Sequence, residues 1–251
     1  MRYEINPNLE EYRDYILDID EIFRRSSNII YNKRNIIKNI AIDGSLWSVK
    51  SFAKPKHINR VIYRFFRKSK ARRSYEYSVK ISKFVPEPLG YIEFYNRGLS
   101  SSYFISKSFE YDFTIRDILF SDLDGEKIEI LKEFAKFTFE LHQEGIEHLD
   151  YSPGNILIKR GESGYIFKIV DINRMRFHNS LDLQQRAINF ARVWLRDEDM
   201  EVIISEYAKI ALYSYEEMLK FALYHSREHK YKANFKKRLK ERIKDVKINS
   251  K

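Results

Sequence analysis

The eleven residues from His148 to Ile158 (His-Leu-Asp-Tyr-Ser-Pro-Gly-Asn-Ile-Leu-Ile) constrain the fold of this 251-residue chain more than any other stretch. They follow a long helical pattern and lead into a short apolar strand. His148, Asp150 and Asn155 therefore fall within one tight loop, and a second acid, Asp171, ends another apolar strand sixteen residues after Asn155. A helix–loop–strand scaffold of this kind can hold two carboxylates and an amide at fixed positions.

These residue types are the set that phosphoryl transfer needs. One carboxylate accepts the proton of the attacking hydroxyl, while an amide oxygen and a second carboxylate hold Mg²⁺ on the phosphates. The order H-x-D-x-x-x-x-N followed by a strand ending in Asp resembles the catalytic loop and metal-binding Asp of the protein-kinase-like fold. We interpret Asp150 as the general base, His148 as the residue that positions the loop, and Asn155 and Asp171 as Mg²⁺ ligands.

The residues before position 53 predict the start of a small antiparallel sheet. Three β-like runs, 27–31, 35–42 and 46–52, are separated by short polar breaks. A kinase covers the phosphates with a Gly-rich loop in its first turn, but the first glycine of this chain is Gly44. Lys33 or Arg34 in the first turn could contact phosphate instead, and an exposed basic hairpin is an equally good interpretation.

Lys50 lies in the third run, where alternation places its ammonium on the opposite face from Val49. Kinases use such a lysine to bind the α- and β-phosphates, paired with an acid on the following helix. The single acid between Lys50 and Lys83 is Glu76, within a helical pattern over 69–80, so we expect Lys50 and Glu76 to pair at the nucleotide. The alternatives are a solvent-facing Lys50 and a Glu76 that neutralises neighbouring arginines.

Two basic segments favour an anionic partner. Residues 57–68 place apolar side chains at helical spacing with cations on the other face, and residues 227–251 hold eleven Lys or Arg against three acids. The chain as a whole carries a net charge of +10. Both segments fit contact with an anionic membrane surface or substrate, but a solvated basic face explains them as well.

The pattern as a whole predicts an α+β, two-lobed protein-kinase-like fold. Residues 1–108 would form an N-lobe with an antiparallel sheet, and residues 109–251 a mainly helical C-lobe. Residues 109–112 would be the hinge that contacts adenine, residues 126–143 form the clearest helix, and residues 198–221 read as one helix or two. The chain has no cysteine, and we expect neither a secretory signal nor a membrane span.

Two absences argue against a protein substrate. Leu149 stands where regulated protein kinases often have an arginine, and no proline follows Pro153, so the chain has no A-P-E segment. Asn173 also replaces the glycine of D-F-G, which predicts a less mobile metal-binding loop, and Arg174 and Arg176 either face an anionic substrate or pair with surface acids. We therefore expect a small molecule or a sugar hydroxyl as the acceptor.

At the level of families, the sequence resembles the lipopolysaccharide core kinases, the Kdo and heptose kinases of Gram-negative inner-core assembly. The blocks that carry the resemblance are Arg34-Asn35, Val49–Phe52, Ser69–Ala71, Arg73–Glu76, Pro86–Pro88, His148–Asn155 and Asp171–Arg174. The catalytic block is shared by many kinase-like families, so the segment 54–76 is what favours this one. The resemblance implies ATP and Mg²⁺ as cofactors and a lipid-linked sugar as substrate.

The same resemblance implies a cytoplasmic protein with peripheral contact at the inner face of the membrane, and no nucleic-acid partner. Two other functions remain open on the sequence: a small-molecule kinase of the aminoglycoside or choline type, and a pseudokinase that binds membrane or nucleic acid. The complete set of catalytic residues opposes the pseudokinase, whereas the missing Gly-rich loop favours it.

Overall fold

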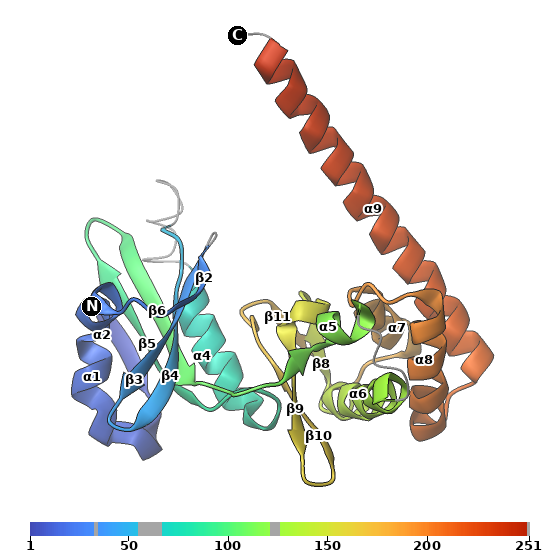
Figure 1. Cartoon of the computed structure of the whole chain (residues 1–251), viewed down its shortest axis with the longest axis horizontal. Coiled ribbons are helices and arrows are strands. Elements are labelled where there is room, and N and C mark those ends of the chain that lie inside the picture. The colour runs from blue at the N-terminus through green and yellow to red at the C-terminus, as the bar shows by residue number, and fades with distance from the viewer. Residues whose placement is uncertain (33–34, 55–66, 121–125, 250–251) are drawn as a thin grey trace. The chain divides into compact units, whose positions relative to one another are not determined.

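The computed structural model describes residues 1–32, 35–54, 67–120 and 126–249 and divides into two compact units. The first unit comprises Met1–Tyr111 with Lys168–Asn173, and the second comprises Asp112–Phe167 with Arg174–Lys251. The chain contains both helices and antiparallel sheets, as predicted for an α+β fold (Figure 1). Within the described residues, we find no helix whose length and apolar character would let it cross a membrane.

The first unit is built on a six-stranded antiparallel sheet in the order β1-β5-β6-β4-β3-β2. Its strands are β1 (Arg2–Ile5), β2 (Ile29–Asn32), β3 (Ile36–Ile42), β4 (Ser45–Ser51), β5 (Pro88–Tyr95) and β6 (Leu99–Lys107). Asp43 and Gly44 join β3 to β4 with positive φ at both positions, the two-residue turn whose twist matches a hairpin. The three runs predicted before residue 53 correspond to β2, β3 and β4.

Helices cover both faces of this sheet. The helical elements are η1 (Pro7–Tyr12), α1 (Arg13–Leu17), α2 (Ile19–Arg25), α4 (Lys70–Lys80) and η2 (Ser82–Phe84). On one face, Ile16 and Ile19 pack against Trp47 and Val49 of β4. On the other face, the α4 side chains Ala71 and Tyr75 pack against Phe52 and Tyr91. Because Val49 faces α1 and α2, the alternation of β4 directs Lys50 toward the α4 side.

Strand β1 is an element that the sequence pattern does not reveal. It pairs antiparallel with β5, with Ile5 opposite Gly90, but only its last residue, Ile5, is buried. A strand with one buried side chain shows no alternation of apolar and polar residues, and alternation is the signal from which strands are predicted.

The second unit is mainly helical. Its helices are α5 (Ile115–Phe120), α6 (Glu126–Gln143), α7 (Leu183–Ala191), α8 (Asp197–Ala211) and α9 (Tyr215–Asn249). Helix α6 matches the predicted bounds, and its inward stripe includes Ile130, Leu131, Phe134 and Leu141. The region 198–221 forms parts of two helices, because Leu212 adopts a left-handed conformation and ends α8. Helix α9 then runs to Asn249, with α7 and α8 beside its first half (Figure 1).

Short strands flank the loop that carries Asp150. Strands β7 (Phe113–Thr114), β9 (Ile156–Gly161) and β10 (Gly164–Ile169) form one sheet in the order β10-β9-β7. Strands β8 (Ile146–His148) and β11 (Met175–Phe177) form a second, antiparallel pair in which Met175 is opposite His148. The turn η3 (Pro153–Asn155) lies between β8 and β9. The loop is therefore anchored by a strand on each side.

Gly145 connects α6 to β8 in a conformation that other residues tolerate poorly. Its φ is +68°, and a Cβ at this position would overlap the carbonyl oxygen of His178. The Gly145 carbonyl in turn accepts a hydrogen bond from the backbone N–H of His178 at 2.8 Å. The close approach of the two backbones fixes where β8 begins after α6.

We predict that Gly145→Ala lowers the free energy of unfolding by more than about 1 kcal/mol, because the added methyl group meets backbone and the φ is unfavourable. Urea unfolding would measure the change. Gly161→Ala is the matched control, since a Cβ there meets only ordinary van der Waals contacts at 3.4 Å or more. Equal stability of the two variants would contradict this role of Gly145.

Candidate active site

In the first unit the structure joins two of the residues predicted for the site, Lys50 and Asp171. The Lys50 ammonium lies 2.9 Å from Oδ1 of Asp171, and both side chains are at least two-thirds buried. Asp171 has a φ of +58°, in the left-handed region that residues other than glycine seldom occupy. Backbone strain of this kind is retained where the surrounding structure holds it, and it is frequent at functional sites.

The carboxylate of Asp171 has a second partner in its own loop. The Asn173 side-chain amide donates a hydrogen bond to Asp171 Oδ1 at 2.5 Å, and Asn173 is itself buried. The sequence predicted a less mobile loop because Asn173 replaces a glycine. The structure adds that the Asn173 side chain binds the carboxylate directly.

Glu76 does not form the predicted pair with Lys50. Its two carboxylate oxygens accept from Arg72 Nε at 2.9 Å and from Lys68 Nζ at 2.8 Å. Burial acts to raise the pKa of Glu76, but the hydrogen bonds from Lys68 and Arg72 outweigh it and hold the pKa below its ordinary value. Two nearer cations, one of them a turn earlier on α4, occupy the carboxylate, and Lys50 pairs with Asp171 instead.

Two predicted features lie outside the described residues. Arg34, with Lys33, belongs to the turn that was expected to replace the Gly-rich loop. Most of the basic segment 57–68 also lies outside, since the description resumes at Arg67.

In the second unit, His148 and Asp150 are joined by a backbone hydrogen bond. The Asp150 N–H donates to Nδ1 of His148 at 3.0 Å, and His148 is fully buried beside the Tyr151 ring. An Nδ1 that accepts a hydrogen bond carries no proton, so the neutral imidazole has its proton on Nε2. This arrangement fits a residue that orients the loop and does not fit a general base.

Asn155 closes the same loop from its other end. Its side-chain amide donates to the Asp150 carbonyl at 2.9 Å, and its backbone N–H donates to the Ser152 carbonyl at 2.9 Å. The Ser152 N–H also donates to the Asp150 carbonyl, at 2.7 Å. Because the NH₂ group of Asn155 is engaged in this way, the amide orientation is set and its oxygen is directed away from the Asp150 carbonyl.

The Asp150 carboxylate is about half exposed and faces Arg174. The distance from Arg174 Nη1 to Asp150 Oδ2 is 3.4 Å, and the Arg174 carbonyl accepts the Leu149 N–H at 3.0 Å. Arg176, the other arginine singled out in the sequence, lies 3.8 Å from Glu147. Arg174 therefore places a cation beside the proposed base, whereas Arg176 contacts a different acid.

A buried chain of hydrogen bonds supports the loop from below. Arg186 donates to the Tyr207 hydroxyl at 2.8 Å, and Tyr207 is 2.8 Å from Nδ1 of His142. Nε2 of His142 is 3.1 Å from Oδ1 of Asn189, whose amide donates to the His148 carbonyl at 2.8 Å.

Arginine can only donate, and Asn189 must present its oxygen to His142 because its nitrogen serves His148. The donors therefore all run one way, from Arg186 through Tyr207, His142 and Asn189 to His148. This chain of hydrogen bonds joins α7, α8 and α6 to the start of the loop that carries Asp150. Burial lowers the pKa of His142 to about 3, so its ring is neutral in this chain.

Arg192 makes a second attachment at the same strand. Its guanidinium contacts Oε1 of the buried Glu147 through two nitrogens, each at 3.1 Å, and the His148 carbonyl at 3.3 Å. These partners are not apparent from the sequence, because an arginine at the end of a helix, as Arg192 is after α7, resembles a solvent-facing position. The one available signal was Glu147 itself, an acid that interrupts an apolar run beside the motif.

The oxygen atoms needed for Mg²⁺ are present on both halves of the motif. Mg²⁺ is usually bound through one or two carboxylates together with substrate phosphates, and Asp171 and the Asn155 amide offer oxygens of this kind. Among the described residues, no cluster of three or more His, Cys, Asp or Glu side chains gathers as a metal site. Asp171 in the first unit and Asn155 in the second are thus each of a residue type that can bind Mg²⁺.

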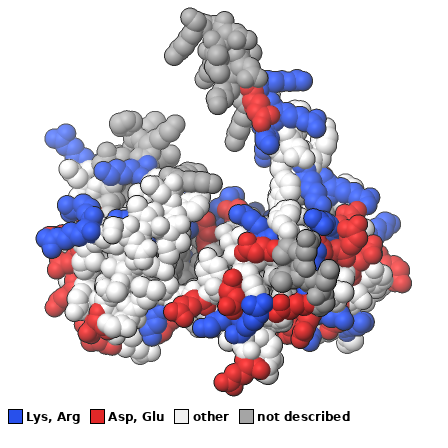
Figure 2. All heavy atoms as spheres, in the orientation of Figure 1, with Lys and Arg blue, Asp and Glu red and all other residues white. Residues whose placement is uncertain are grey.

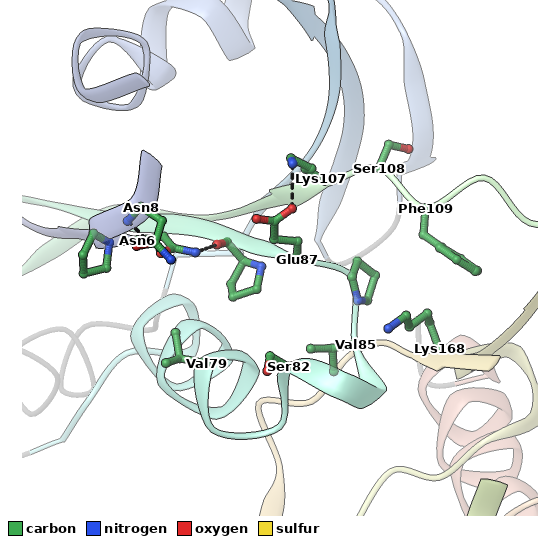
Figure 3. A pocket seen from close by; sticks show the side chains of 13 residues that line it. Asn6, Asn8, Val79, Ser82, Val85, Glu87, Lys107, Ser108, Phe109 and Lys168 are labelled. Carbon is green, nitrogen blue, oxygen red and sulfur yellow. Dashed lines mark hydrogen bonds and ion pairs between the residues drawn. The ribbon is translucent and has the colours of Figure 1, made fainter. Parts of the chain in front are cut away.

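The first unit also contains a cavity of about 520 Å³ that holds none of the predicted site residues. Val79 and Val85 line it together with Phe109 and Lys168, and the Lys107–Glu87 ion pair stands at its edge (Figure 3). Lys168 donates to the Lys83 carbonyl at 2.7 Å, and burial lowers its pKa. This cavity is formed within the first unit, separately from the Lys50–Asp171 pair.

No protein-family model matches the chain, and no curated protein matches its sequence. A solved structure of WaaP in complex with acyl carrier protein matches with a TM-score of 0.59 at 12% identity. The match covers 92% of this chain and 99% of that one. The fold predicted from the sequence is thereby confirmed, since this chain and WaaP share one fold.

We predict that stability falls as the pH is lowered through the range in which His142 would ordinarily titrate. Its pKa is about 3 in the folded chain and 6.5 in the unfolded one, so between these values only the unfolded chain binds the proton. The free energy of unfolding then decreases by up to about 1.4 kcal/mol per pH unit below 6.5, and the contribution is complete above 6.5. Urea unfolding near pH 7 and near pH 5 measures it.

His142→Gln is the reference for this experiment, because glutamine cannot titrate and other groups contribute equally to both proteins. The wild-type chain should lose more stability on acidification than the variant does. An identical pH dependence in the two proteins would show that His142 is not buried in its neutral form.

Proposed function

We propose that this protein is an ATP-dependent kinase that phosphorylates a sugar hydroxyl, Kdo or heptose, of the lipopolysaccharide inner core. The observation that carries the proposal is the 2.9 Å ion pair between Lys50 and Asp171. In a kinase-like fold these two positions hold the phosphates and the metal of the nucleotide. Their pairing, with Asp171 held in a strained conformation, is what supports a nucleotide-binding role.

Asp150 is proposed to accept the proton of the attacking hydroxyl. Its carboxylate is half exposed, so an acceptor can reach it, and its backbone is held by His148 and Asn155. The Arg174 guanidinium lies 3.4 Å from the Asp150 carboxylate, on the side where an anionic acceptor could also be held. His148 is a positioning residue, since its Nδ1 is already engaged with the Asp150 N–H.

Asn155 and Asp171 are proposed to hold Mg²⁺. When bound, the metal would neutralise charge on the phosphates. Lys50 would contribute further positive charge. Glu76 would act indirectly, through its ion pairs with Lys68 and with Arg72 of α4. Arg34 keeps its proposed phosphate contact in place of a Gly-rich loop.

The lipid-linked sugar acceptor rests on the family resemblance and on the similarity of fold to WaaP. A fold alone does not specify a substrate, because one fold hosts many activities. The absence of an A-P-E segment in the sequence supports a non-protein acceptor. A lipid-linked acceptor would place the enzyme at the cytoplasmic face of the membrane, in peripheral contact with it.

Asp150→Asn is expected to lower kcat by about 100- to 10,000-fold, the usual contribution of a general base, with nearly unchanged ATP affinity. Kinetics on core oligosaccharide and calorimetry with Mg·ATP would measure the two quantities. Asp43→Asn is the matched control, because Asp43 is an exposed turn acid with positive φ, which asparagine also adopts. Unchanged turnover in Asp150→Asn would remove Asp150 from the mechanism.

Lys50→Met is expected to weaken Mg·ATP binding by about 10- to 100-fold, the effect of losing a hydrogen bond from a charged group. Lys107→Met provides the control, since Lys107 is paired with Glu87 at the surface of the same sheet. Calorimetry again gives the affinities. Unchanged Mg·ATP affinity in Lys50→Met would remove Lys50 from the nucleotide site. No Mg²⁺-dependent ATP binding by the wild-type chain would favour the pseudokinase interpretation.

The acceptor class can be tested by incubating the protein with ATP and either core lipid or a panel of soluble alcohols. Mass spectrometry should show addition of one phosphate group to core lipid. If phosphate were added only to aminoglycoside- or choline-type acceptors, the protein would be a kinase, but lipopolysaccharide would not be its substrate.

A further inference from the structure

One side of helix α9 packs against α7 and α8 within the second unit. The opposite side carries an exposed row of apolar side chains. Met218, Ala222 and Ser226 are buried on the packed side. The row on the other side consists of Tyr224, Tyr231, Phe235 and Leu239, which are 62%, 72%, 57% and 48% exposed. Their spacing of seven, four and four residues keeps them on one face, over about 22 Å of helix.

Cations border this row on both sides. Between Arg227 and Leu239 the helix carries six Lys or Arg and a single acid, Glu228. Arg227 and Arg238 lie on one side of the row and Lys232 and Lys236 on the other, as helical spacing requires. Figure 2 shows Lys and Arg gathered along the described part of α9, with uncharged surface between them.

Most contacts that hold α9 come from its first half. Arg227 pairs with Asp197 at 2.9 Å, and Lys230 donates to the Leu195 carbonyl at 2.6 Å. From Tyr231 to Leu239 every described side chain except Ala233 is exposed. The helix thus continues past its support in the second unit (Figure 1), and its aromatic side chains are left facing solvent.

We propose that this face of α9, the row Tyr224–Leu239 with its bordering cations, binds the interface of an anionic lipid bilayer. Tyrosine and phenylalanine rings suit the boundary between headgroups and acyl chains, and lysine and arginine stems can lie along it while their charges meet lipid phosphates. An anionic bilayer would therefore bury the apolar row and neutralise the surrounding positive charge at the same time.

Other occupants fit this face less well. A second copy would bring two strongly positive segments together, which is unfavourable. A partner helix needs a seam of two apolar rows, but the positions three residues after Tyr224, Tyr231 and Phe235 are Arg227, Asn234 and Arg238. A single row bordered by cations matches a flat anionic surface.

The inference deepens the membrane contact of the proposed function, but it is tested without ATP or acceptor. The full chain is mixed with vesicles of phosphatidylcholine alone or with about one-third phosphatidylglycerol, and binding is measured by co-sedimentation. We expect affinity for the anionic vesicles to be at least about tenfold higher, since each cation near such a surface contributes about fivefold. Added salt should weaken binding.

The variant Tyr231→Ser/Phe235→Ser/Leu239→Ser should lose at least about tenfold in affinity for the anionic vesicles, because three apolar side chains leave the bilayer. Phe120→Ser is the control, since Phe120 is 74% exposed and lies in the same unit. Equal melting curves by circular dichroism would show that all variants fold.

Three results would overturn the proposal. The first is unchanged vesicle binding by the triple variant, and the second is equal binding of the wild-type chain to neutral and anionic vesicles. The third is a dimer in analytical ultracentrifugation that the triple variant abolishes, which would assign the row to self-association. If the wild-type chain bound anionic vesicles but had no kinase activity, the proposed function would be contradicted and this inference would still hold.

Discussion

The hydrogen bond from Asn189 to the His148 carbonyl is the contact on which the candidate site most depends. It ends a buried chain of donors that begins at Arg186 and passes through Tyr207 and His142. Arg186 can only donate, so each following group must accept from the residue before it and donate to the residue after it. Only one pattern of hydrogen bonds is therefore possible in this network. Buried polar networks that are fully satisfied in this way specify one geometry, and an unpaired member costs much of their stability.

Few hydrogen bonds connect this network to Asp150 and Asn155, the two loop residues proposed for the site. The His148 ring holds the Asp150 N–H, and the Asp150 carbonyl accepts from Asn155 and Ser152. The loop between β8 and β9 therefore has its backbone set before any substrate is present. In the first unit, Asp171 is held in a comparable way, by Lys50 and Asn173. Preorganised polar groups of this type are how phosphoryl transfer is catalysed, since positioning and electrostatics dominate that reaction.

Much of this could be predicted from the sequence because it is encoded locally. The candidate loop is recognised by the spacing of His148, Asp150 and Asn155, α6 by its regular apolar stripe, and β2 to β4 by their short β-prone runs. The features that were missed depend on distant parts of the chain. His142 and Asn189 are forty-seven residues apart, and each looks like an ordinary surface polar residue on its own helix.

The expected Lys50–Glu76 pair illustrates the same limit for charges. A sequence shows which lysines and arginines are close to an acid in residue number, and several are close to Glu76. It does not show that Lys68 and Arg72 saturate the carboxylate, or that the Asp171 carboxylate takes Lys50. Competition among charges is decided by distance in the folded chain, so the order of charges along the sequence does not predict which of them pair.

The most direct measurement is a crystal structure of the protein with Mg²⁺ and a non-hydrolysable ATP analogue. We predict that the metal lies about 2.1 Å from an Asp171 carboxylate oxygen and from the Asn155 amide oxygen, with Lys50 on the phosphates. A nucleotide bound elsewhere, or a metal that contacts neither Asp171 nor Asn155, would contradict the assignment of this loop to phosphoryl transfer.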